Sequence, residues 1–159
     1  MEFARIALLA TITAALAACG GGPRDQSESA AVDTAARAAD SAAKAARSGA
    51  QRVANVMIGK RLGAGNRIAE PTFQFAAQDT VFVAGEIQGA PKEGSLTARW
   101  LAQGGKVIDS TTQPISASDT GYKEFHLPAP AKGWQPGTYL VTLYLNGDSA
   151  EAKTFAVRK

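Results

Sequence analysis

Short segments in which apolar and polar residues alternate follow one another after Gln51, and this pattern constrains the fold more than any other feature. Turn residues separate the segments, among them Gly104-Gly105 and Asn146-Gly147. Alternation with a period of two is typical of strands that have one buried and one exposed face. Residues 51–159 are therefore predicted to form one all-β domain of seven or eight short strands, in segments such as "TVFVAGEI", "SLTARWL", "KVIDSTT", "YKEFHL", "TYLVTLYL" and "AKTFAV".

Two residues of this region match landmarks of immunoglobulin-like domains. Trp100 falls on the third main strand expected, where such folds bury a tryptophan, and "GTYLV" places Tyr139 where a tyrosine corner begins the sixth. The region resembles the Ig-like domains of bacterial envelope proteins, which implies an immunoglobulin-like antiparallel β-sandwich. With one cysteine in the chain, no disulfide can join the sheets, so the resemblance is to fibronectin type III-like relatives. It implies no particular activity.

The first 18 residues resemble the signal peptide of a bacterial lipoprotein. Arg5 precedes an uncharged run, residues 6–18, that is too short to span a bilayer comfortably. Leu16-Ala17-Ala18-Cys19 is similar to a lipobox, which implies cleavage before Cys19 and acylation of its thiol. The implied location is the bacterial cell envelope, on the outer membrane facing the periplasm in a Gram-negative host, because Gly20 rather than aspartate follows. A plain signal peptide with a chance cysteine, or an uncleaved anchor, is the alternative.

Two connecting segments follow the cysteine. Residues 19–28 are rich in glycine and polar residues, as in a flexible tether. Residues 29–50 are rich in alanine and carry the pairs Asp33–Arg37 and Asp40–Lys44, so a helix that stops near Ser48-Gly49 is predicted. The apolar stripe of that helix is thin, which favours a solvated spacer over a coiled coil that forms a weak homo-oligomer. The residues of the stripe are Val32, Ala35, Ala36, Ala39, Ala42, Ala43 and Ala46.

The residues that carry chemistry do not form a catalytic pattern. His126 is the one histidine and falls on an exposed strand face, without a nucleophile signature near it. One cysteine and one histidine cannot make a Cys/His zinc cluster, and "AQGGKV" lacks the spacing of a phosphate loop. The formal charge of +3 is spread without a Lys/Arg run, which excludes a nucleic-acid footprint. No catalytic residue, metal site or cofactor is predicted, apart from the covalent lipid on Cys19.

Binding is the remaining class of function, and the strand pattern supplies candidate residues. The third and sixth strands are neighbours in an Ig-like sheet, so Arg99, Leu101, Leu140 and Tyr144 are predicted to share one exposed patch for an envelope protein partner. Trp134 in "KGWQPG" is a further candidate, for stacking on a sugar or a peptide. Scattered surface residues, and a tryptophan packed under its own corner, are the alternatives. A structural role, by oligomerisation through residues 29–50 or contact with cell-wall glycan, is the second hypothesis.

Overall fold

The computed structural model describes residues 26–90 and 92–159. The predicted signal peptide, Cys19 and the tether up to residue 25 lie outside the described residues. Eight strands, one α-helix and a short 3-10 helix, η1 at Ala64–Asn66, are the regular elements of the described chain. No helix in this part of the chain is long and apolar enough to cross a membrane.

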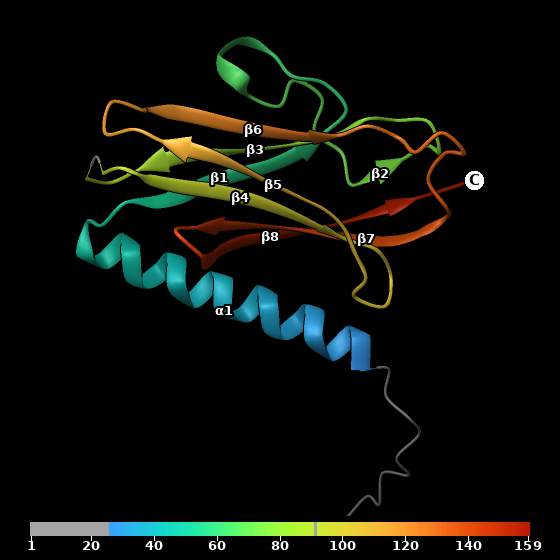
Figure 1. Cartoon of the computed structure of the whole chain (residues 1–159), viewed down its shortest axis with the longest axis horizontal. Coiled ribbons are helices and arrows are strands. Elements are labelled where there is room, and N and C mark those ends of the chain that lie inside the picture. The colour runs from blue at the N-terminus through green and yellow to red at the C-terminus, as the bar shows by residue number, and fades with distance from the viewer. Residues whose placement is uncertain (1–25, 91) are drawn as a thin grey trace, which may run out of the picture.

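Two sheets face each other in a sandwich (Figure 1). The smaller sheet has the order β1-β3-β6, formed by Arg52–Gly59, Val81–Gln88 and Gly121–Leu127. The larger sheet has the order β2-β8-β7-β4-β5, formed by Gln74–Phe75, Asp148–Val157, Gly137–Leu145, Gly94–Leu101 and Val107–Ile115. All pairings are antiparallel except that of β2 with β8. The predicted all-β, immunoglobulin-like sandwich is confirmed, with β4 and β7 adjacent.

Apolar side chains from alternate positions of both sheets fill the space between them. Phe155 lies at the centre of an aromatic cluster, stacked on Tyr139 at 5.3 Å and edge-on to Phe75 at 5.3 Å and Trp100 at 6.3 Å. Such ring pairs add to the free energy gained by removing apolar area from water. The other fully buried side chains include Val53, Ile58, Val81, Val83, Leu96, Val141 and Leu143. Apolar packing therefore joins the two sheets without a disulfide, and the Gln113 side chain on β5 adds a hydrogen bond to the backbone oxygen of Glu124 on β6 at 2.8 Å.

The connection from β6 to β7 is closed by a tyrosine corner. The Tyr139 hydroxyl donates to the backbone oxygen of Gln135 at 2.7 Å, four residues upstream. Trp134 lies beneath the same corner, with its ring 5.3 Å from that of Tyr139. Its Nε1–H donates to the backbone oxygen of Asp79 at 2.8 Å, and the Trp134 amide donates to Ala77. The corner predicted at Tyr139 is confirmed, and it ties the β6–β7 connection to the segment before β3.

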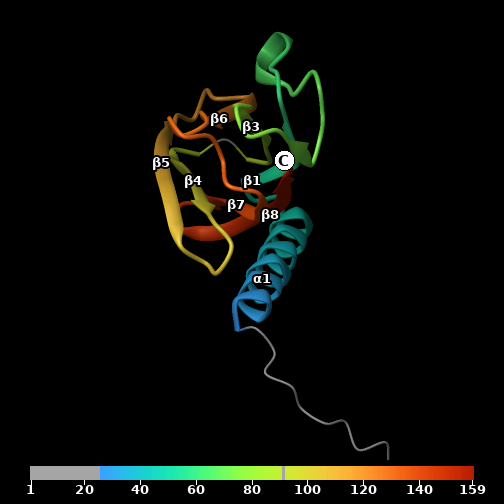
Figure 2. The same ribbon diagram turned by 90° about the vertical axis from the view of Figure 1, so that its right-hand side faces the viewer.

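Helix α1, Gln26–Ser48, packs along β8 and also contacts β1. Both Figure 1 and Figure 2 show it beside β8, running in the opposite direction to that strand. Among helix positions 33–44, the less exposed side chains are those of Thr34, Ala38 and Ala42, at intervals of four, with Ala38 only 1% exposed. The helix ends before Gly49, whose positive φ of 66° suits a glycine after a helix. Its predicted stop is confirmed, and its first residue comes three positions earlier than predicted.

The expectation of a free, solvated spacer does not fit this arrangement. Ala35, Ala36, Ala39 and Ala43 are exposed, whereas the neighbouring face lies against the domain. Methyl side chains allow a helix to approach a strand closely. Because alanine occurs on every face of this helix, the sequence pattern does not indicate which face packs against the sheet. Because β2 pairs only with the last residues of β8, α1 shields much of what remains of this sheet edge, which otherwise could pair with another chain.

Candidate functional site

The strand register brings the four predicted patch residues onto one face of the larger sheet. Leu101 on β4 is directly opposite Leu140 on β7, and Arg99 is opposite Thr142. Tyr144 is opposite Thr97, which places it diagonal to Arg99. Arg99 is exposed, and the other three predicted residues are half-buried. The four residues therefore form one surface. The role of this surface in binding stays a prediction.

A cation–π contact joins the polar half of this face. The Arg99 guanidinium carbon lies 5.2 Å from the centre of the Tyr144 ring. Stacking on an aromatic ring holds a guanidinium in place and leaves the N–H donors at its edge available. No carboxylate forms a salt bridge with Arg99 among residues 26–90 and 92–159. The face thus presents an oriented positive charge that can accept an acidic group.

Strand β5 enlarges the apolar half of the face. Val107 pairs with Leu101 and is 50% exposed, so it forms a row with Leu101 and Leu140 across three strands. Further along, the hydroxyls of Thr97 and Thr112 are 2.8 Å apart. Alternation in "KVIDSTT" predicts a strand there but does not place Val107 beside Leu101. The Gly104-Gly105 turn between the two segments was the signal that could have paired them.

Two residues do not lie where the strand pattern suggested. Strand alternation puts Thr142, between Leu140 and Tyr144, on the same outward face of β7, but Thr142 is fully buried between Arg99 on β4 and Ala152 on β8. Trp134 is only 3% exposed, and its polar nitrogen is bonded within the domain. It cannot stack on a sugar or a peptide in this structure, so the prediction that it binds a ligand is wrong. The alternative, packing under its own corner, is confirmed.

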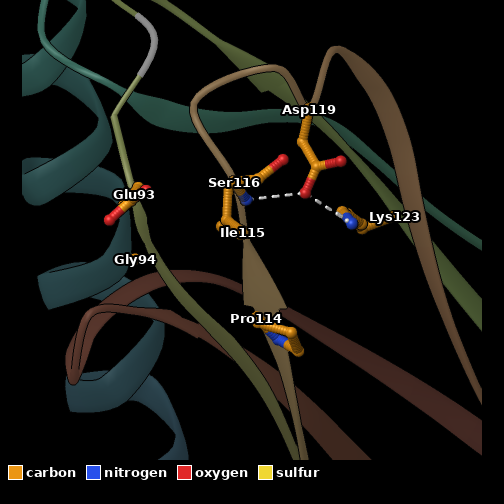
Figure 3. A pocket seen from close by; sticks show the side chains of 7 residues that line it. All are labelled: Glu93, Gly94, Pro114, Ile115, Ser116, Asp119 and Lys123. Atoms are coloured by element: carbon orange, nitrogen blue, oxygen red, sulfur yellow. Dashed lines mark hydrogen bonds and ion pairs between the residues drawn. The ribbon is translucent and has the colours of Figure 1, made fainter.

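The remaining polar clusters are satisfied by their own neighbours. Figure 3 shows a shallow hollow where Asp119 accepts from the Ser116 amide at 2.8 Å and forms an ion pair with Lys123 at 2.8 Å. Both contacts lower the pKa of Asp119 below its usual value, and the contact with Lys123 has the larger effect. His126 is exposed as predicted and lies 3.4 Å from Glu124. Within the described ranges, no three His, Cys, Asp or Glu side chains gather as metal ligands would.

A half-buried ion pair holds the segment before β3 that supports the Trp134 corner. Lys60 lies 2.7 Å from the Asp79 carboxylate and the Ala76 amide donates to it at 2.7 Å, so both lower the pKa of Asp79. A carboxyl whose pKa is lower in the folded state contributes stability above its unfolded pKa, about 3.9, and loses it as the pH falls through the folded value.

We expect Asp79→Asn to lower the free energy of unfolding at neutral pH and to reduce its further loss between about pH 4 and pH 2. Urea unfolding at a series of pH values measures both effects. Asp148→Asn, at an exposed position, is the matched control and keeps the full acid dependence. Equal pH slopes for wild type and Asp79→Asn would contradict the assignment.

The fold defines the class of this protein as an Ig-like β-sandwich domain. An immunoglobulin-like protein from Pseudomonas aeruginosa is similar, with a TM-score of 0.51, 13% identity and coverage of 68% of this chain and 96% of that one. Weaker similarity links it to a Pseudomonas fluorescens alkylpurine DNA glycosylase, with a TM-score of 0.45, 12% identity and coverage of 69% of this chain and 30% of that one. No family model and no curated protein matches the sequence.

Proposed function

We propose that this chain is a lipid-anchored protein of the bacterial cell envelope, acylated on Cys19, that displays a non-enzymatic Ig-like domain for binding a protein partner. The observation that carries the binding part is the face on β4, β5 and β7. It combines an apolar row, formed by Leu101, Leu140 and Val107, with Arg99 stacked on Tyr144. The lipobox-like Leu16–Cys19 supports the anchor.

The chemistry of the face indicates which partner fits it. A guanidinium that is held by an aromatic ring and has free N–H donors favours a carboxylate, which it binds with two parallel hydrogen bonds. The apolar row beside it favours an aliphatic or aromatic side chain. Arg and Tyr are also enriched among the residues that dominate binding energy at protein interfaces. The partner is therefore a protein segment that presents an acidic residue next to an apolar one.

The double variant Leu101→Asp/Tyr144→Asp is expected to weaken partner binding by at least about 30-fold, since a hot-spot residue contributes about 2 kcal/mol or more. The domain should stay folded, because neither side chain is fully buried. To identify the partner, a photocrosslinking amino acid replaces Leu101 in the native envelope and the captured product is sequenced. The same amino acid at the exposed His126, on the other sheet, is the control.

One discrete protein product at position 101, absent at position 126 and lost on Arg99→Glu, supports the proposed face. Its crosslinked peptide should contain a carboxylate side chain near the attachment point. Products shared equally by positions 101 and 126, or products that contain only glycan, contradict it. Glycan alone at position 101 would instead favour the structural role in contact with the cell wall.

A further inference from the structure

The proposed lipid anchor places a limit on how far the domain can stand from the membrane. Six residues, 20–25, separate Cys19 from the first residue of α1 at Gln26. A fully extended chain spans at most about 3.6 Å per residue, so the start of α1 lies within about 25 Å of the acylated cysteine. That length is less than the diameter of a small domain, so whatever part of the sandwich adjoins this helix end is brought close to the lipid headgroups.

The end of the sandwich nearest to that helix terminus can be identified from the topology. Because α1 runs opposite to β8, its first residues lie toward the end of β8 at Val157. The end of β4 and the start of β5 lie at the same end, since Leu101 pairs with both Leu140, near the start of β7, and Val107. Both views place the β4–β5 turn beside the start of α1 (Figure 1 and Figure 2).

The large exposed apolar side chains of the described chain gather at this end. The described chain has three exposed large hydrophobic residues, Phe73 at 59%, Val107 at 50% and Ile108 at 39%. Val107 and Ile108 begin β5 just after the turn, and Phe73 immediately precedes β2, which pairs with the last residues of β8. All three therefore lie at the same end of the sandwich. Val107 belongs to the proposed partner face, so Phe73 and Ile108 are the apolar side chains available to insert among lipid headgroups.

Basic residues surround these apolar side chains. Lys106, Lys132, Arg158 and Lys159 are all exposed, on the β4–β5 turn, the β6–β7 connection and the segment after β8. The loops form one continuous surface: a methyl group added at Gly137 would lie 3.1 Å from the side chain of Gln103, and the Trp134 amide is bonded to Ala77.

Acidic residues of the same end do not cancel this charge. Asp79 is paired with Lys60, and Asp109 is half-buried and accepts a hydrogen bond from Thr111. The end thus keeps an excess of exposed cations, and each basic side chain near an anionic membrane surface strengthens association about fivefold.

We infer that this end of the sandwich, defined by the β4–β5 turn with Lys106 and Ile108, the β6–β7 connection with Lys132, and Arg158, rests on anionic phospholipid headgroups of the membrane that holds the anchor. This inference depends on the proposed acylation of Cys19. The domain is then held with its strands directed away from the bilayer, and its opposite end, at the β7–β8 turn, points outward.

The acylated full chain in vesicles tests this orientation directly. Cys19 is the one cysteine and its thiol is blocked by lipid, so Gln103→Cys and Asp148→Cys each introduce a single site for a fluorophore. Vesicles of phosphatidylcholine with or without phosphatidylglycerol carry a nitroxide quencher on the headgroup. We expect strong quenching at position 103, enhanced by phosphatidylglycerol, and little at position 148.

Charge variants supply the control. Lys106→Glu/Lys132→Glu should abolish the enhancement by phosphatidylglycerol, whereas Lys44→Glu/Lys92→Glu, equal in charge and exposed toward the other end, should retain it. Equal quenching at positions 103 and 148, or no response to Lys106→Glu/Lys132→Glu, overturns the orientation. Flotation of the chain with the vesicles reports the anchor separately, so a chain that does not float refutes the acylation, and a chain that floats without selective quenching refutes only the orientation.

Discussion

Replacing Trp134 with alanine is expected to lower the free energy of unfolding by about 3–5 kcal/mol, the usual cost of removing a buried tryptophan. Its ring packs edge-on against Tyr139 at 5.3 Å and Phe155 at 6.4 Å. A domain of this size has a total stability of roughly 5–15 kcal/mol, so the loss is a large part of it. Urea unfolding followed by circular dichroism measures the change.

Trp134→Phe separates the packing of the ring from its hydrogen bond. Phenylalanine keeps most of the aromatic contact but cannot donate to the backbone oxygen of Asp79, so a loss of about 1 kcal/mol is expected. His126→Ala, on the exposed face of the other sheet, should change stability by less than about 0.5 kcal/mol. A Trp134→Ala variant as stable as wild type would show that the corner does not depend on this residue.

The parts of the fold that were predicted correctly are those that local pattern determines. Alternation located the main strands, the glycine turns separated them, and the positions of Trp100 and Tyr139 identified the sandwich. The pairing of β2 with β8 could not be foreseen, because it joins two residues at positions 74–75 to the end of the chain. The burial of Trp134 could not be predicted for the same reason, since its hydrogen-bond partner lies 55 residues earlier in the sequence.

The candidate face was also predictable only in part. That β4 and β7 are neighbours followed from the resemblance to Ig-like folds, so Leu101 and Leu140 were correctly brought together. Val107 was missed because strand alternation says which residues share a face but not which strand lies next. Helix α1 was misjudged because its small side chains give no dominant apolar stripe, and only tertiary contact identifies Ala38 as the buried position.

Replacing Cys19 with serine is expected to abolish acylation completely and to leave the chain uncut, with residues 1–18 still attached. In a lipobox the sulfur of the cysteine thiol receives the lipid. A serine hydroxyl does not replace it, because a thiol ionises to its nucleophilic form far more readily than a hydroxyl does. Each acyl methylene that enters the bilayer contributes about 0.8 kcal/mol, and stable anchoring needs more than one chain. Incorporation of labelled fatty acid in a bacterial host measures acylation, and the mass of the purified chain shows whether the leader is removed.

Ser27→Ala, a substitution of similar size in the connecting segment, should keep full incorporation and normal processing. Loss of the label from Cys19→Ser, together with the retained leader, would tie both steps to this one thiol. Label that persists in Cys19→Ser, or a wild-type chain that takes up no fatty acid, would refute the anchor. A wild-type chain cleaved without lipid would identify a plain secreted protein, whose folded Ig-like domain and binding face would then act in free solution.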